Sequence, residues 1–256
     1  MNGRIKKIFQ NIAFAAVAVG IVIAIWSIAA AVIGTELIMP SVPTVFSALG
    51  DIFKSRAFWA SLGYTLLRGA IGFALSAALA FLLYFLNTVF AACAKVTEPI
   101  ISALRALPTM AVTLILAIWV GGYAAPVVIC VLAVTPYLYA NVKARNAAVP
   151  TELKEICRLC GAGRVRTFFV LWLPHAAAGL PETLSTGFSF GVKAVIAAEI
   201  LMQTADSLGQ LMNLSKIYFE TAMLIAFVFA AVVVTVVAEF VIRAALGAAL
   251  KNFKDV

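Results

Sequence analysis

Charged and metal-binding side chains are scarce in this sequence. Only 12% of the 256 residues are charged, one is a histidine (His175), and the four cysteines are scattered. A structural zinc site needs four ligands and a secreted disulfide scaffold needs a dense cysteine framework, so neither class fits. No Gly-x-x-x-x-Gly-Lys-Ser/Thr phosphate loop occurs in the sequence, so we do not expect this chain to hydrolyse ATP.

Apolar residues dominate what is present. They make up 64% of the chain, with a mean hydropathy of +1.08, a balance that ordinary soluble domains do not reach. The apolar runs leave no segment long enough to bury a separate aqueous core, so we expect a single membrane domain over residues 1–256. The net charge of +8 comes from basic residues that lie between the apolar runs. We therefore expect them to set the membrane topology and do not expect a nucleic-acid partner.

Six apolar runs are long enough to cross a bilayer, which takes about 20 residues at a rise of 1.5 Å each. The first is too long for the core of a signal peptide, so we expect a transmembrane helix there. The third and fourth are separated only by Gly121, Gly122 and Tyr123, which predicts a tight helical hairpin. The predicted spans of this all-α membrane protein are residues 10–34, 61–86, 99–121, 124–144, 174–202 and 219–247.

Lysine and arginine gather in alternate loops, which sets the orientation. One side holds Arg4, Lys6, Lys7, Lys95, Lys143, Arg145, Lys154, Arg158, Arg164, Arg166, Lys251 and Lys254, and the other holds Lys54, Arg56 and Lys216. Both termini are therefore predicted to be cytoplasmic, with one large basic cytoplasmic loop at about residues 145–173. Two outer segments, residues 39–55 and 206–220, have amphipathic patterns that predict short interfacial helices.

The basic loop contains Cys157 and Cys160, which are three residues apart and would share a helix face. A metal or redox site there lacks further ligands, so small packing residues are the preferred interpretation. Thr151 is a plausible N-cap with Glu152 in the first turn, and a helix would run to about Cys160. Gly161 and Gly163 would then turn the chain into a second short helix that ends near Leu173 and Pro174.

The spacing in this loop resembles the EAA motif of permeases from binding-protein-dependent ABC importers. That motif has Glu, two small residues, three of any kind, Gly, nine of any kind, then an aliphatic residue, any residue, Leu and Pro. Here it is matched by Glu155, Ile156 and Cys157, then Gly161, then Leu171, Trp172, Leu173 and Pro174. Ile156 and Cys157 replace the usual two alanines, which makes the docking face slightly bulkier at Ile156.

Weaker fragments along the chain are similar to the sulfonate, taurine and nitrate group of these permeases. Leu114 departs from the pattern, because a second proline is common at its position. The matching fragments are Pro40-Ser41-Val42-Pro43, Leu107-Pro108, Ala111, Trp119-Val120-Gly121, Pro136 with Asn141, Ala198-Glu199 and Leu208-Gly209.

The resemblance implies a type I ABC importer permease fold in the bacterial cytoplasmic (inner) membrane. Two permease chains would form a homodimeric pathway for a small polar or anionic organic solute, delivered by an extracytoplasmic binding protein. Each chain would dock a coupling helix, at about 151–161, on one of two cytoplasmic ATPase subunits. The chain would then be no enzyme and would bind no cofactor, since ATP and Mg belong to the ATPase. The implied coupling residues are Glu152, Glu155, Cys157, Gly161, Leu173 and Pro174.

The fifth predicted span carries polar residues at helical spacing. Glu182, Thr186, Ser189 and Lys193 fall on one face and are candidates for the solute pathway. Lys193 would attract an anion there, or would pair with Glu199 as a structural ion pair, since an intramembrane lysine normally faces a cavity or a partner charge. Glu199 is a fifth candidate of the pathway, where it is expected to be structural or gate-forming and not a ligand.

Other polar residues of the spans have structural interpretations. Gly187 and Gly191 have the Gly-x-x-x-Gly spacing that lets another helix approach closely. We expect Arg68 and Arg105 to snorkel to opposite interfaces and Glu239 and Arg243 to form an intrahelical ion pair. Tyr137 and Tyr139 either contribute to a pathway lined with aromatic residues or lie in the interfacial belt, which is the preferred interpretation.

Two other function classes fit less well. An ion-gradient-driven secondary transporter could use Lys193 with Glu199, but the six spans show no inverted repeat and the basic loop would have no purpose. A membrane redox or metal-sensing protein would depend on Cys157 and Cys160 alone.

Overall fold

The computed structural model describes residues 2–249, with the side chains of this range except those of residues 2–12 and 15. Every regular element in this range is a helix, which confirms the all-α class. Five helices are long and apolar enough to cross a membrane, or six if one bent pair counts as a single span. The predicted topology signals Arg4, Lys6, Lys7, Lys251 and Lys254 lie outside the described side chains, so the orientation stays a prediction.

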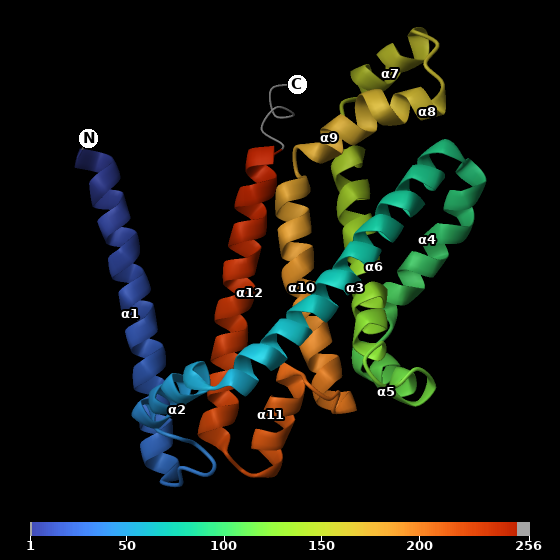
Figure 1. Ribbon diagram of the computed structural model, residues 1–256. Coiled ribbons are helices and arrows are strands. Elements are labelled where there is room, and N and C mark those ends of the chain that lie inside the picture. The colour runs from blue at the N-terminus through green and yellow to red at the C-terminus, as the bar shows by residue number, and fades with distance from the viewer. Residues whose placement is uncertain (1, 250–256) are drawn as a thin grey trace. The chain divides into compact units, whose positions relative to one another are not determined.

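The elements are numbered in chain order in Figure 1. They are α1 (Asn2–Ile33), α2 (Val42–Lys54), α3 (Arg56–Val89), α4 (Ala91–Ala106), α5 (Thr109–Trp119), α6 (Ala125–Ala147), α7 (Thr151–Leu159), α8 (Arg164–Thr167), the π-helix η1 (Phe168–Trp172), α9 (Leu173–Ala177), α10 (Leu180–Met202), α11 (Leu208–Ile217) and α12 (Thr221–Ala249). The two outer segments predicted to be helical correspond to α2 and α11.

The chain divides into two compact units, and the first contains residues 1–59 and 211–230. Its described part holds α1 and α2 together with the start of α12. The indole N–H of Trp26 donates a hydrogen bond to the carbonyl of Pro40 at 3.0 Å, and its ring stacks on Phe229 with centroids 5.9 Å apart. These contacts tie the end of α1 to the turn before α2 and to α12. The prediction of one domain over residues 1–256 stays a prediction.

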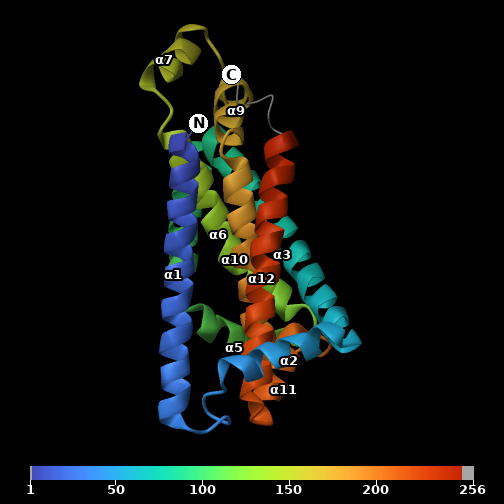
Figure 2. The same cartoon turned by 90° about the vertical axis from the view of Figure 1, so that its left-hand side faces the viewer.

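The second unit contains residues 60–210 and 231–256, and its centre is the pair formed by α6 and α10. These helices run side by side in both views of the molecule (Figures 1 and 2). Cys130, Val134 and Leu138 of α6 and Val195 of α10 are fully buried there. Burial of these apolar side chains leaves the opposite faces of the helices for lipid or for partner chains.

The small residues of α10 explain why the two helices lie so close. A Cβ added at Gly187 would lie 2.8 Å from Leu138 Cδ2, and one added at Gly191 would lie 2.9 Å from Cys130 Sγ. Both distances are shorter than normal Cβ contacts, so a side chain at either position would force the neighbouring side chain of α6 to shift. The close helix approach predicted from the Gly-x-x-x-Gly spacing is therefore present, with α6 as the partner.

The third predicted span, residues 99–121, falls on a bent pair of helices and not on one straight helix, because the chain breaks at Leu107 and Pro108. The helix axes of α4 and α5 differ by 98° across this break. Proline has no N–H to donate and pushes the residue before it out of the helical region, and Leu107 accordingly has an extended backbone with φ −67° and ψ 130°. The predicted hairpin that follows is confirmed, since α5 ends at Trp119 and α6 begins at Ala125.

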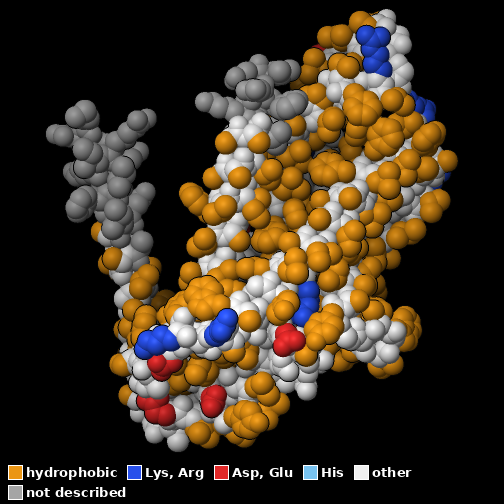
Figure 3. Space-filling model, in the orientation of Figure 1, with side chains coloured by type: hydrophobic (Ala, Val, Ile, Leu, Met, Phe, Trp, Pro, Cys, Tyr) orange, Lys and Arg blue, Asp and Glu red, His pale blue; other side chains and the backbone are white. Residues whose placement is uncertain are grey.

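Large apolar side chains remain exposed along the spans. Hydrophobic residues cover most of the face of α3 and α4 that is visible in Figure 3, and residues such as Ile118, Val236 and Phe240 are more than half exposed. Such continuous apolar surface is unfavourable in water but normal against lipid tails.

Candidate functional site

The segment after α6 forms a helical elbow that begins with α7. Thr151 is the first helical residue, and the cap position before it is occupied by Pro150, with no side-chain cap hydrogen bond. The prediction that Thr151 is the N-cap is therefore wrong, because the fixed φ of Pro150 places the start of the helix directly after it. Glu152 lies in the first turn as predicted, where its charge is favourable beside the positive end of the helix dipole.

Gly161 ends α7 in a Schellman motif. The N–H of Ala162 donates to the carbonyl of Cys157 at 3.0 Å, and the N–H of Gly161 donates to the carbonyl of Arg158 at 3.0 Å. This motif needs a left-handed residue, and Gly161 has φ +65°. A side chain at this position would be strained, so the glycine sets the direction in which the chain leaves α7.

Most of α7 is exposed, since none of its residues is buried and only Lys154 and Cys157 are half-buried. Leu153, Ile156 and Leu159 follow one another at steps of three and are exposed, Leu159 to 87%. In Figure 1, α7 and α8 lie beyond the ends of α6 and α10. An otherwise polar helix with exposed apolar residues at helical spacing is suited to insertion into a groove of another protein.

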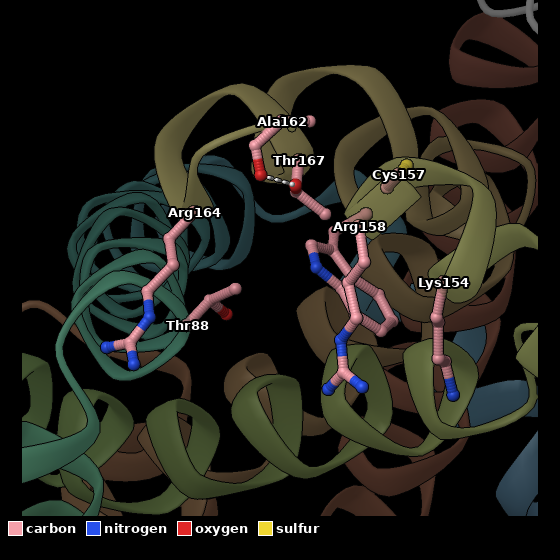
Figure 4. Close-up of a pocket in the computed structure, with 8 residues that line it drawn as sticks. Thr88, Lys154, Cys157, Arg158, Ala162, Arg164 and Thr167 are labelled. Carbon is pink, nitrogen blue, oxygen red and sulfur yellow. Dashed lines mark hydrogen bonds between the residues drawn. The ribbon is translucent and has the colours of Figure 1, made fainter. Parts of the chain in front are cut away.

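Basic side chains fasten the elbow to the rest of its unit. A cavity of about 310 Å³ lies between α7, α8 and the end of α3, and Lys154, Arg158 and Arg164 point in the same direction along it (Figure 4). Arg164 donates to the carbonyl of Val89 at 3.1 Å, at the negative end of α3, and the Lys154 ammonium lies 5.4 Å from the centre of the Trp172 ring. These contacts connect α8 to the end of α3, and α7 to η1.

The second half of the elbow differs from its predicted form. The prediction that Leu173 and Pro174 end it is wrong, because the helical backbone runs on from Arg164 to Ala177. Pro174 lies in the first turn of α9, where its missing N–H costs little, and the chain breaks later, at Gly179. The fifth span therefore begins at Leu180 and not at residue 174.

Aromatic packing holds the base of this second half. Phe168, the first residue of η1, is buried, and its ring meets Phe85 of α3 edge to face with centroids 4.9 Å apart. Single π-turns within helices are often found at functional sites. Here the π-turn joins the elbow to α3 through three aromatic pairs, Phe168 with Phe85 and with Tyr84, and Phe169 with Phe85.

The two cysteines of the elbow do not form a site of their own. Cys157 is partly exposed and Cys160 is exposed, and both are unbonded. Among the described residues, no group of three or more histidine, cysteine, aspartate or glutamate side chains could hold a metal ion.

The four predicted pathway residues of α10 lie in different environments. Glu182 is exposed and pairs with Arg145 at 3.1 Å, whereas Thr186 donates to Glu239 at 3.2 Å. Ser189 is buried, and Lys193 is exposed and makes no ion pair with any described carboxylate. The four residues share one side of the helix, but they do not form one polar surface.

Two further ion pairs join side chains in the same unit. The predicted ion pair of Glu239 with Arg243 is confirmed at 3.2 Å. Tyr139 is buried, and its hydroxyl donates to Glu98 at 2.6 Å. Glu98 also pairs with Lys143 at 2.6 Å.

Glu199 is fully buried, and its partner is Arg68 of α3. The two side chains are 2.8 Å apart, and Thr65 donates to the other carboxylate oxygen at 2.8 Å. The predicted alternatives of a Lys193–Glu199 pair and of a snorkelling Arg68 are therefore both wrong. Thr65 and Arg68 are three residues apart on one face of α3, a spacing that sequence reasoning could have connected to a buried partner.

This cluster also holds the segment after α10. Arg68 donates to the carbonyl of Ala205 at 3.2 Å, and the N–H of Leu208 donates to Thr65 at 3.0 Å. Glu199 is thus structural in this conformation, because it orders the turn between α10 and α11.

Together, the spans and the elbow define a multi-pass helical membrane protein with one exposed helical arm between two of its spans. The family model for the inner-membrane component of binding-protein-dependent transport systems matches residues 90–250, well over half of the chain. The chain belongs to this family, and it is therefore a permease component of an ABC importer. A search of curated proteins found no significant match.

Solved structures agree on the fold. An inward-facing structure of the MetNI methionine ABC transporter is 22% identical, with a TM-score of 0.57 over 77% of this chain and 94% of that one. A second crystal form of the same transporter gives 20% identity, a TM-score of 0.57 and coverages of 76% and 93%. A crystal structure of an amino acid ABC transporter with histidines is 16% identical, with a TM-score of 0.59 and coverages of 81% and 97%. The fold is thus that of type I ABC importer permeases.

Proposed function

We propose that α7 is the coupling helix of this permease and docks on a cytoplasmic ATPase subunit. Two copies of the chain would form the pathway, with two ATPases below and an extracytoplasmic binding protein above. Both termini and the elbow would then be cytoplasmic, in the inner membrane of a bacterium. ATP with its Mg would be bound by the ATPase alone.

The observation that carries the proposal is the exposure of α7 together with its glycine-dependent end. The helix has no buried residue, and its direction depends on the left-handed Gly161 at the position expected for the EAA motif. Glu152, Glu155 and Cys157 would contact the ATPase around the exposed Ile156. The continuous helix through Leu173 and Pro174 would transmit the movement toward α10.

We further propose a small polar or anionic organic solute and the sulfonate, taurine and nitrate group of permeases. The fragments around Pro40, Leu107-Pro108 and Leu208-Gly209 support that group. Lys193 makes no ion pair with any carboxylate that the structure describes. This favours a role in attracting anions over a role in a structural ion pair.

Substitution of Gly161 tests the coupling assignment. Gly161→Asp places a side chain at φ +65°, which should distort the end of α7, so we expect loss of solute uptake and ATP hydrolysis that no longer responds to the binding protein. The measurement is uptake and ATPase activity of the full importer in proteoliposomes.

Gly163→Asp is the matched control. Gly163 has an ordinary φ of −63° and, like Gly161, open space around its Cβ position. The control should transport normally with the same charge added two residues away. Wild-type uptake by Gly161→Asp, or equal loss in both variants, would contradict the proposal.

A further inference from the structure

A cavity without an assigned role lies beside the break between α4 and α5. The cavity measures about 380 Å³, and its lining includes Arg105 and Thr109 on the two sides of the break, Tyr137 and Asn141 of α6, and Phe190 of α10. A volume of this size is at the small end of the range for small-molecule sites. All of these residues belong to the same compact unit.

One side of this cavity is positive. Arg105 has no ion-pair or hydrogen-bond partner among the side chains that the structure describes. The first backbone hydrogen bonds of α5 are donated by Ala111 and Val112, so the N–H groups of Thr109 and Met110 have no backbone acceptor, and no side chain caps them. An arginine beside an uncapped helix N-terminus favours a negative charge.

The position of the break within a pair of apolar helices also favours a negatively charged ligand. It divides a bent pair of apolar helices that is either a broken span or a re-entrant loop, and in such segments unpaired backbone groups occur where they line a cavity or meet a ligand. Broken membrane helices with their N-terminal ends directed at anionic solutes are a general solution in transport proteins.

The rest of the lining is mostly aromatic and apolar. The rings of Tyr137 and Phe190 are 5.7 Å apart, and the lining also includes Leu104, Leu107, Ala133, Pro136 and Ala140. Phe190 stands four residues after Thr186 and three before Lys193, so it lies on the same side of α10 as these two predicted pathway residues.

We propose that this cavity binds a small organic anion, whose acidic group contacts Arg105 and the first-turn amides of α5 while its apolar or planar part packs against Tyr137 and Phe190. The proposal rests on the proposed import function and names the solute site within it. It also separates the roles of Arg68 and Arg105, because Arg68 is neutralised by Glu199 and Arg105 is available for a ligand.

Direct binding to the full-length permease in lipid nanodiscs, without partner subunits, tests this site. The probes are benzenesulfonate and its uncharged analogue benzenesulfonamide, followed by isothermal titration calorimetry. We expect the anion to bind at least about tenfold more tightly than the amide, and Arg105→Gln to remove about tenfold from the anion's affinity without changing that of the amide, since a hydrogen bond to a charged group contributes about that factor. Phe190→Ala should weaken both probes.

Arg56→Gln is the matched control, because Arg56 is exposed and does not line the cavity. If Arg105→Gln fails to fold, Arg105→Lys decides, and it should keep the preference for the anion. Four results would overturn the site. The first two are equal anion affinity in Arg105→Gln and the wild type, and equal affinity of the wild type for the two probes. The others are loss of the preference in Arg105→Lys, and no binding at millimolar concentration. Such a failure leaves the coupling assignment intact, whereas normal uptake by Gly161→Asp would remove the coupling assignment whatever the probes do.

Discussion

At the scale of single residues, the buried pair of Arg68 and Glu199 is the most constrained feature of the second unit. Glu199 has no exposed surface, and each of its carboxylate oxygens accepts a hydrogen bond, from Arg68 and from Thr65. A buried charge is costly without such partners, so the two side chains depend on each other. Their loss should release the turn at residues 203–207, which Arg68 holds through Ala205.

Arg68→Met should destabilise the protein by about 3–5 kcal/mol, because it leaves the Glu199 carboxylate buried without its counter-charge. The measurement is reversible unfolding of the purified permease in mixed micelles.

Adding Glu199→Gln to Arg68→Met should recover most of the stability that Arg68→Met removes. Glutamine removes the charge and keeps an oxygen that can accept the hydrogen bond from Thr65. A double variant as unstable as Arg68→Met alone would show that the pair does not act through charge compensation.

At the scale of elements, the contact between α6 and α10 depends on the absence of side chains at two positions of α10. Cys130 of α6 is enclosed between Gly191 and Gly72 of α3, with added Cβ atoms 2.9 Å from its Sγ and 2.6 Å from its Cβ respectively. In lipid there is little hydrophobic drive between helices, so this close packing supplies much of the attraction.

Gly191→Ala should cost about 1–3 kcal/mol, the usual effect of one extra methyl group in a tightly packed contact. The loss should fall when Cys130→Ala is added, since that change removes the sulfur atom that the new methyl group meets. Unfolding in mixed micelles again provides the measurement.

Gly63→Ala in α3 serves as the comparison, because nothing lies within 4 Å of its Cβ position. It should be neutral or stabilise the protein by about 0.4–1 kcal/mol. Equal effects at positions 63 and 191 would contradict the packing argument.

Hydropathy predicted the helical class and the approximate place of the spans, but not their breaks. The third predicted span reads as one apolar run, yet Pro108 divides it, and the break is specified by one residue that a window of about 20 residues averages out. Before the fifth span, a proline predicts a helix end that does not occur. Pro174 lies in the first turn of α9, where proline is tolerated.

The candidate site was predictable where it is local in sequence. The extent of α7, its first-turn Glu152 and the turn at Gly161 follow from residues a few positions apart. The partners of Glu199 could not be ranked in this way, because Lys193 is six residues away and Arg68 is 131 residues away. Long-range pairing depends on how α3 and α10 pack, which one sequence does not specify.

At the scale of the whole molecule, the permease combines a membrane-embedded unit with an exposed arm. The arm is tied to α3 by Arg164 and by the contact of Phe168 with Phe85, and it continues as helix up to Ala177, just before α10. A force applied to α7 would therefore reach both α3 and α10. These same helices are joined at their other ends by Arg68 and Glu199.

Site-specific photocrosslinking from α7 tests the central claim most directly. A benzoylphenylalanine replaces Leu159, the most exposed large apolar residue of the helix, or, as the matched control, Ile217 in α11, which is 53% exposed. In the assembled importer, we predict that position 159 forms an adduct with the ATPase subunit and that position 217 does not. An ATPase adduct from position 217, or none from position 159, would contradict the assignment of α7 as the coupling helix.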